Sequence, residues 1–506
     1  ALGYQAGLSV TTGIRNTILG GVAGDAITTG SNNIAIGYQA LTTEDTGNKS
    51  IAIGDSTLSN QNYDGDAHNI AIGHNAGENV STGVQNILIG GLAGDALTTG
   101  GNNVAIGYLA LSTENEHGNN IAIGAGALLN QDAGADAFNV AVGHNAGLTI
   151  TTGTQNTLIG GLAGDAITAG TFNVAVGHEA LSTEDTGTRS VAIGWRALKL
   201  QNFDGEAFNI AIGHNAGASV STGIRNTLIG GLAGDALTTG GDNVAIGYDA
   251  LSAEDDHGFN VAIGRSALGS QNAGTNAYNV AIGYNAGYSV STGVRNVLLG
   301  GHAGDNITTG TYNIAIGYHA LGTEDTHGKN IAIGDLALAA QDAGADAYNT
   351  AVGHNAGVLM TTGTQNTLIG GLAGDALTTG STNVAIGYQA LSTEDTRGGN
   401  VAIGRYALQV QNADADSFST AVGYNAGVSV STGIKNVILG GKAGDALTTG
   451  SNNIIIGYEA AASAVDVSNE ITLGDANISA FRCADQSIAA LSDGRDKTDI
   501  KDSKFG

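Results

Sequence analysis

A strict 70-residue repeat constrains this chain more than any other feature of its sequence. A pentapeptide of the form N-[IV]-[AI]-[IV]-G stands at one fixed position of every 70-residue unit without a slip. Its copies begin at Asn33, Asn103, Asn173, Asn243, Asn313, Asn383 and Asn453. Such a repeat predicts one supersecondary unit stacked on itself. Because near-identical layers rarely build one asymmetric pocket, the repeat argues against most enzymes.

Each 70-residue unit divides into shorter layers. The glycine that closes the pentapeptide recurs along the chain in a repeating pattern of steps, which are 17, 17, 19 and 17 positions long. The series begins with Gly3, Gly20, Gly37, Gly54, Gly73 and Gly90 and ends at Gly474. These steps predict about 28 stacked layers. The layer is then the true repeat, and the 70-residue period is a pattern laid over it.

The layer around Asn103 shows how one coil is built. Val104 and Ile106 alternate with Ala105, which places the two large side chains on one face and the small one on the other. Asn103 and Gly107 bracket this segment, and both residue types tolerate turns and left-handed conformations. The layer therefore predicts a short strand between two turns.

A second short extended stretch is expected at Ala110 and Leu111, followed by a polar loop. Two short strands and two turns in each 17-residue layer are typical of one coil of a parallel β-solenoid. We therefore predict an all-β solenoid shaft over residues 1–475 and a distinct C-terminal segment over residues 476–506. At about 4.8 Å per coil, the shaft would be roughly 130 Å long.

Alanine stands three residues after almost every layer glycine. Ala40 and Ala110 are examples, and only Thr57 and Asn477 interrupt the column. Two interpretations remain open, namely a cramped corner inside the coil and a flat seam where identical chains meet. Because a coil this thin encloses little interior, association between chains would supply additional burial.

The composition excludes several partners. The chain has 45 acidic and 18 basic residues, and its net charge of −27 argues against binding to nucleic acid or to an anionic membrane. No apolar run approaches the roughly 18 residues of a membrane span, and we expect no membrane insertion. The single Cys483 allows no disulfide within the chain. The sequence opens at Ala1 inside a layer, so we expect it to be part of a longer protein.

Rings and acidic loops are candidates for a binding site. The position after the layer glycine is Tyr or His in alternate layers, as at Tyr38 and His74, and these rings are expected to pack between chains or to stack on sugars. The longest loop of the unit is acidic, as at Asp64 and Asp66 or at Asp132. Such loops could hold Ca²⁺, although a solvated edge explains them as well. We expect no other metal and no cofactor.

The remaining recurrent acids have structural explanations. Asp95 and Asp165 belong to a G-x-A-G-D motif, in which the carboxylate is expected to cap turn N–H groups. Glu44 and Glu184, each followed by Asp, are expected at exposed loop tips. The residues expected to shape the coil are Asn33, Gly37, Ala40, Asp95, Asn103, Gly107, Ala110 and Asp165.

The repeat N-x-V-A-I-G-x-x-A resembles the head repeat of trimeric autotransporter adhesins. Residues 103–107 with Ala110 fit this pattern, and so do residues 190–194 with Ala197. The resemblance covers residues 1 to about 475 and implies left-handed parallel β-rolls wound side by side as homotrimers. The 17-residue and 19-residue layers are longer than the usual repeat of that family, which implies longer loops on one edge.

The C-terminal segment resembles the junction between a bacteriophage tail fibre and its endosialidase-type intramolecular chaperone. The motif S-D-x-R-x-K of that family is met at Ser492, Asp493, Arg495 and Lys497. In the family, the chaperone trimerises the fibre and then cleaves itself off with the serine and the lysine. The resemblance implies that Ser492 is the nucleophile and that Lys497 accepts its proton. The alternative is that Ser492 is an ordinary loop serine in a trimer cap.

These features predict a structural and adhesive protein. We expect the shaft of a homotrimeric phage tail fibre, in the virion and outside the cell, that presents a surface to a host glycan or outer-membrane component. The alternative is the head of a bacterial trimeric adhesin that mediates surface attachment. A polysaccharide depolymerase would need a unique carboxylate pair in a groove, whereas the acids here recur in every unit. Near-identical units show no distinctive patch, so the sequence leaves the receptor-binding residues unassigned.

Overall fold

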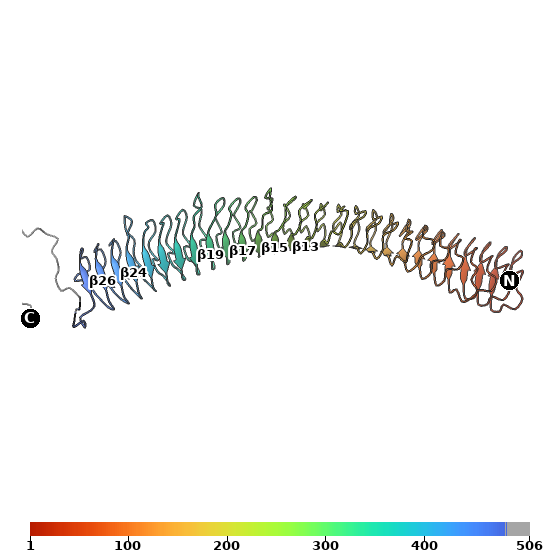
Figure 1. Ribbon diagram of the computed structural model, residues 1–506, viewed down its shortest axis with the longest axis horizontal. Coiled ribbons are helices and arrows are strands. Elements are labelled where there is room, and N and C mark those ends of the chain that lie inside the picture. The colour runs from red at the N-terminus through yellow and green to blue at the C-terminus, as the bar shows by residue number, and fades with distance from the viewer. Residues whose placement is uncertain (481, 483–506) are drawn as a thin grey trace, which may run out of the picture.

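Short parallel strands, one in each coil, follow one another along a gently curved rod (Figure 1). The computed structural model describes residues 1–480 and 482, and within them 27 strands of three residues each form one parallel sheet. These described residues include no helix, and so none that could cross a membrane. The predicted all-β parallel solenoid is therefore confirmed.

The strands recur with the spacing of the layer glycines. Their bounds are β1 (Thr17–Leu19), β2 (Ile34–Ile36), β3 (Ile51–Ile53), β4 (Ile70–Ile72), β5 (Ile87–Ile89), β6 (Val104–Ile106), β7 (Ile121–Ile123), β8 (Val140–Val142), β9 (Thr157–Ile159), β10 (Val174–Val176), β11 (Val191–Ile193), β12 (Ile210–Ile212), β13 (Thr227–Ile229), β14 (Val244–Ile246), β15 (Val261–Ile263), β16 (Val280–Ile282), β17 (Val297–Leu299), β18 (Ile314–Ile316), β19 (Ile331–Ile333), β20 (Thr350–Val352), β21 (Thr367–Ile369), β22 (Val384–Ile386), β23 (Val401–Ile403), β24 (Thr420–Val422), β25 (Val437–Leu439), β26 (Ile454–Ile456) and β27 (Ile471–Leu473).

Each strand pairs with the next strand of the chain in a constant register. Val104 of β6 lies beside Ile121 of β7, and Ile121 lies beside Val140 of β8, although the second step is two residues longer. The extra residues are therefore accommodated in a loop outside the sheet. At the N-terminal end, Leu2 forms an isolated bridge to Leu19 and adds one rung. The strands and this bridge together match the layers counted from the glycines.

The prediction of a second strand in each coil is wrong. At Ala110 and Leu111 the backbone forms consecutive turns, in which Leu109 and Leu111 have φ values of 58° and 53°. A left-handed leucine costs roughly 1–2 kcal/mol. Hydrogen bonds between coils offset this cost, because the Leu109 N–H donates to Gly91 O over 3.1 Å and the Leu111 N–H donates to Ala127 O over 3.0 Å. The wall opposite the sheet is thus a column of turns joined to both neighbouring coils.

The asparagine that opens each strand builds a ladder through the rod. The left-handed residue is Asn102, with φ 59°, one position before the expected Asn103. Asn103 itself is fully buried, and its N–H donates to Oδ1 of Asn86 over 3.0 Å. The side-chain amide of Asn86 donates in turn to Gly100 O over 2.9 Å. Because each asparagine bonds to the coils on both sides, this residue satisfies backbone groups that a three-residue strand leaves unpaired.

The position that ends each strand must be glycine for two reasons, namely its backbone conformation and the close approach of the next coil. Gly107 has φ 139°, a conformation that residues with a side chain rarely adopt. A Cβ atom at Gly107 would lie 2.5 Å from the carbonyl oxygen of Gly124 in the next coil. Any larger residue in this column would therefore separate adjacent coils.

The small face of each strand is the inner face. Ala105 is fully buried, whereas Val104 and Ile106 on either side of it are only partly buried. The alanines three residues after the layer glycine, Ala40 and Ala110 among them, are also fully buried within a single chain. This burial supports the interior-corner interpretation of the alanine column and removes it as a seam between chains. The buried side chains form one continuous core from Ile18 to Ala460.

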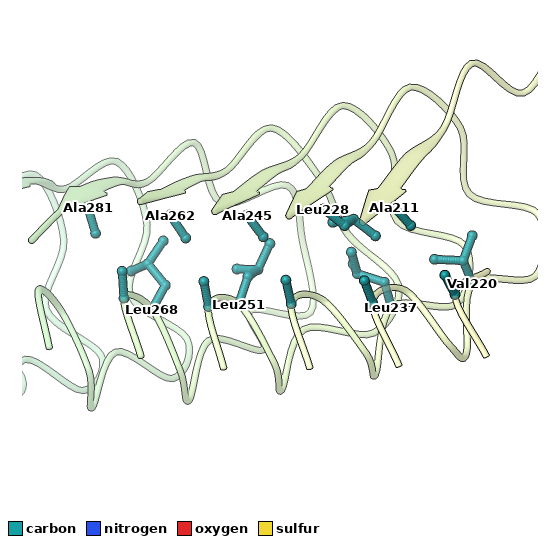
Figure 2. Close-up of a cluster of buried hydrophobic side chains, with 14 of the residues drawn as sticks. Ala211, Val220, Leu228, Leu237, Ala245, Leu251, Ala262, Leu268 and Ala281 are labelled. Carbon is teal, nitrogen blue, oxygen red and sulfur yellow. The ribbon is translucent and has the colours of Figure 1, made fainter. Parts of the chain in front are cut away.

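The 70-residue period is a packing pattern of this core (Figure 2). Three successive strands place alanine at their centre, as at Ala245 and Ala262, and the fourth places a leucine such as Leu228. Leu228 fills space left by glycine, since a Cβ at Gly217 would lie 2.6 Å from its Cδ1 and a Cβ at Gly234 would lie 2.8 Å from its Cδ2. Large and small residues therefore alternate between the two walls, which keeps the coils equally wide.

Candidate functional site

The outward face of the sheet carries two columns of side chains, one apolar throughout and one apolar except for threonine in six strands. Because the middle residue of each strand points inward, the two residues beside it point outward. These residues are half-buried or exposed, and Ile121 and Ile159 are 37% and 39% exposed. At about 4.8 Å per strand, the columns form an apolar strip roughly 130 Å long. We call this feature, from β1 to β27, the outer strip.

A column of rings follows the outer strip, at the position after the layer glycine in alternate layers and also at Trp195. Trp195 and His214 of successive coils stack with their ring centroids 4.7 Å apart. The guanidinium of Arg265 lies 5.9 Å from the ring centroids of both Tyr248 and Tyr284, which stand one coil to either side. Tyr248 and Tyr284 are about half exposed. Exposed rings of this kind pack well against another chain or against the face of a sugar.

Two open hollows at equivalent positions of the rod combine an aromatic ring with polar groups. One hollow of about 470 Å³ is lined by Asp45, Asn62, Tyr63, Asp64 and Thr82. Another of about 460 Å³ is lined by the equivalent residues Asp185, Asn202, Phe203, Asp204 and Thr222. Carboxylate, amide and hydroxyl groups around one ring are suited to a sugar.

These hollows distinguish two units from the others. The position of Tyr63 and Phe203 is alanine in other units, namely Ala133, Ala273, Ala343 and Ala413. The expectation that the units show no distinctive patch is therefore wrong at this position. The sequence signal was available, because an aromatic residue replaces alanine at one repeat position.

The prediction that Glu44 and Glu184 lie at exposed loop tips is also wrong, because both side chains are fully buried. The position seven residues after the layer glycine points into the coil. In successive coils of one unit it holds Glu44, Gln61, Val80 and Leu97, and all four are buried. Because Val and Leu occupy the same position in neighbouring coils, the sequence did contain a signal that the glutamate at this position is buried.

Glu44 is fully satisfied inside the coil. Its Oε1 accepts the N–H of Gly47 over 2.6 Å, and its Oε2 accepts Nε2 of Gln61 over 2.9 Å. Burial raises the pKa of Glu44, and the hydrogen bonds from Gln61 and Gly47 oppose this rise. Glu184 has the same arrangement, with Nε2 of Gln201 at 2.9 Å from its Oε2.

Glu114 occupies the equivalent position in the unit after that of Glu44, but its carboxylate has different hydrogen bonds. Its Oε1 accepts the N–H groups of Asn115 and His117 over 3.1 and 3.2 Å. Its Oε2 is buried and has no hydrogen-bond partner among the described residues, and the same is true of Nδ1 of His117 and Nδ2 of Asn120. Nδ1 of His117 lies 3.6 Å from Oε1 of Glu114. Burial raises the pKa of Glu114, and the N–H of His117 opposes the rise.

Later units repeat this arrangement with variations. Glu254 and His257 show the same 3.6 Å separation and the same buried atoms without partners in the described part of the chain. In the following unit, Glu324 lies near Asp325 and Asp342 as well as a histidine. Burial, strengthened by those two carboxylates, raises the pKa of Glu324 to about 7.

The aspartates of the G-x-A-G-D motif lie between coils. Burial raises the pKa of Asp95 and of Asp165. Hydrogen bonds from Ser112 of the next coil and from the N–H of Asp95 itself oppose the rise for Asp95. For Asp165, a hydrogen bond from its own N–H opposes the rise. Oδ1 of both residues is buried without a partner in the described structure. Capping of turn N–H groups therefore explains these aspartates only in part.

The acidic loops carry ion pairs at the edge of the rod. Asp66 accepts Nζ of Lys49 at 2.6 Å, and Asp346 accepts Nζ of Lys329 at 2.5 Å. Asp64 accepts the hydroxyl of Thr46 over 2.6 Å. Solvent screens such exposed pairs, so they contribute little to the stability of the fold. Binding of Ca²⁺ to these loops stays a prediction.

Ser492 and Lys497, the residues expected to perform self-cleavage, lie outside the described residues. Comparison with known protein families, with curated proteins and with solved structures found no match for this chain. The fold therefore defines the class of protein, which is a parallel β-solenoid repeat protein.

Proposed function

We propose that this chain is the shaft of a homotrimeric phage tail fibre, an extracellular part of the virion that carries a host-binding surface. The outer strip is the observation that supports association between chains. A strip roughly 130 Å long and about 10 Å wide amounts to about 1,300 Å². A typical monomer exposes patches of only about 300–600 Å². A stable interface covers about 800 Å² on each partner, so the strip is large enough for a lasting contact with further copies.

The mass of the untruncated chain in solution tests this proposal. Sedimentation equilibrium or light scattering should give about three times the chain mass of 50.1 kDa. The resemblance of the C-terminal segment to a chaperone junction supports the trimer, and a product that ends near Ser492 would support self-cleavage. A monomeric rod with a solvent-exposed strip would contradict the proposal.

The aromatic hollows support an adhesive role with a glycan as the receptor. The expected result is that the double substitution Tyr63→Ala and Phe203→Ala weakens binding of the protein to host cells or to their surface polysaccharide. Tyr278, an exposed ring outside both hollows, provides a matched control as Tyr278→Ala. Equal binding by the double variant and the parent would place the receptor contact elsewhere. Turnover of the polysaccharide would instead indicate a depolymerase.

The head of a bacterial trimeric adhesin is the second candidate function. The repeat N-x-V-A-I-G-x-x-A favours it, because that repeat resembles adhesin heads. The two candidates differ at the C-terminal segment, since only a fibre with a chaperone junction would be cleaved near Ser492. A full-length trimer that binds surfaces without cleavage would favour the adhesin.

A further inference from the structure

The buried glutamates of the chain have two different environments. Where glycine stands three residues after the glutamate, as Gly47 does after Glu44, a glutamine of the next coil donates to the free carboxylate oxygen. In the unit of Glu114 that position holds His117. The equivalent glutamine, Gln131, instead donates to Thr151 O over 3.2 Å. Glu114 is therefore fully buried with one oxygen that no described group satisfies.

The groups around this oxygen are potential ligands for a metal ion. Nδ1 of His117 is buried without a partner among the described residues, and it lies 3.6 Å from Oε1 of Glu114, the other oxygen of the same carboxylate. Asp132, from the long loop of the next coil, completes the group, and the ligand atoms of the three residues all lie within 4.8 Å of one another. A buried carboxylate without a partner is costly, and a bound cation would remove that cost.

We propose that Glu114, His117 and Asp132 bind a divalent transition-metal ion, and that Zn²⁺ is the best match. One imidazole nitrogen and two carboxylates form a three-ligand set that zinc accepts, with water in the fourth position. With bonds of about 2.0 Å, the ligands of a tetrahedral zinc stand about 3.3 Å apart. The 3.6 Å between Nδ1 of His117 and Oε1 of Glu114 is close to this spacing. Ca²⁺ requires six to eight oxygen ligands and does not match this set.

The arrangement recurs in later units. Glu254, Asp255 and His257 form a second group in which the glutamate oxygen and Nδ1 again lack described partners. A third group combines Glu324, Asp325, His327 and Asp342. In this group the two corresponding atoms have partners, because Nδ1 of His327 lies 2.8 Å from Oγ1 of Thr326 and Nδ2 of Asn330 donates to Oε2 of Glu324 over 3.4 Å. The ion at the first and third groups would link the loop of one coil to the long loop of the next.

The next unit of the chain provides a natural control. It retains the buried Glu394 but has Arg397 in place of the histidine. The substitution of this histidine by arginine is therefore compatible with the coil. The variant His117→Arg, His257→Arg and His327→Arg should fold, and should lose all three ions.

Metal content after dialysis of untagged full-length protein against Zn²⁺ tests the proposal. We expect the triple variant to retain three fewer ions per chain than the parent, and His117→Arg alone to retain one fewer. The exposed His144 provides the control, because His144→Arg should leave the metal content unchanged. Zn²⁺ should also raise the Tm of the parent and leave that of the triple variant unaltered.

Two results would overturn the proposal. One is a parent that retains no Zn²⁺ after dialysis, which would mean that a proton or a water molecule satisfies Glu114. The other is equal zinc content in the parent and the triple variant. The group of His302, Asp305 and His319 does not confuse the comparison, since all three residues are unchanged in every variant. Stabilisation by Ca²⁺ but not by Zn²⁺ would refute the choice of metal.

Discussion

The side-chain amide of Gln61 donates a 2.9 Å hydrogen bond to the buried carboxylate of Glu44. Gln61 belongs to the next coil, so the bond joins two layers through the interior of the rod. Gln201 and Glu184 repeat it two units later. Among the described residues, the presence or absence of this bond divides the 70-residue units into two kinds, which the strand pattern alone does not separate.

Loss of the Gln61 amide should destabilise the coils around Glu44. The variant Gln61→Ala leaves the buried Oε2 of Glu44 with only the 3.4 Å hydrogen bond from the N–H of Tyr63. Loss of the shorter bond should cost about 1–3 kcal/mol. Because a solenoid opens locally, the effect should be confined to adjacent coils. Hydrogen exchange of the amides near Glu44 should report the lower opening free energy.

Gln131→Ala is the matched control for this prediction. Gln131 is equally buried and occupies the same position in its coil, but it does not bond to Glu114. Its removal should therefore cost less than removal of Gln61. Equal exchange rates around the two substitutions would show that the bond to Glu44 contributes nothing specific.

The complementary packing of Gly77 and Leu88 should appear as a coupling energy. Leu88→Ala leaves a cavity and should cost about 2–5 kcal/mol. Gly77→Ala should also destabilise, because its Cβ would lie 2.5 Å from Cδ1 of Leu88 and its φ is +60°. The double variant removes the collision, so its loss should be at least about 0.5 kcal/mol smaller than the sum of the two single losses. Additive losses in denaturant unfolding would contradict this packing.

The stability of the rod should fall as the pH rises above the ordinary glutamate range. Burial raises the pKa of Glu44 and of Glu184 above the usual value of 4.5. The folded chain then holds these protons more tightly than the unfolded chain. Their contribution is therefore fully present below pH 4.5 and is lost as the pH rises through the raised pKa values.

Thermal melting between pH 4 and pH 8, in the presence of a chelator, checks this dependence. The variant Glu44→Gln and Glu184→Gln should show a smaller fall in Tm than the parent. Glu116 is exposed, and Glu116→Gln should leave the slope unchanged. The same slope in all three proteins would assign the pH dependence to the overall negative charge.

Charge on the outer strip should prevent association without unfolding the coil. Ile121 and Ile212 point outward and are 37% and 36% exposed, so Ile121→Asp and Ile212→Asp leave the core intact. We expect the double variant to shift toward monomers in sedimentation while its circular dichroism stays that of the parent. Leu200, which is exposed in a turn, gives the control Leu200→Asp. A double variant that keeps the parent mass would exclude the strip as the interface.

Local patterns allowed much of the fold to be predicted. The spacing from Gly107 to Gly124 gives the coil, and the alternation around Ala105 gives the strand. The turns found in place of a second strand at Ala110 and Leu111 could not be predicted, because alternating left-handed leucines have no signature in their side chains. They exist only because neighbouring coils accept their hydrogen bonds.

The residues of the candidate sites could be predicted from the sequence only in part. Tyr63 stood out in principle as a ring at a position that is alanine in most units. Glu44 and Glu114 looked like exposed loop residues, because a charged side chain in a polar loop is usually solvated. Their burial depends on which way the loop turns, and no single coil determines that direction.

The sequence by itself determined the parallel stack, the number of layers and the identity of each column, because a strict repeat forces equivalent residues to lie above one another. Only the tertiary structure decided which side of each strand is the interior. It also decided that Leu228 fills the space above Gly217, and that Glu114 has lost the amide that Glu44 retains. These outcomes depend on contacts between coils, and their free energy comes from side chains that meet only after the chain has wound on itself.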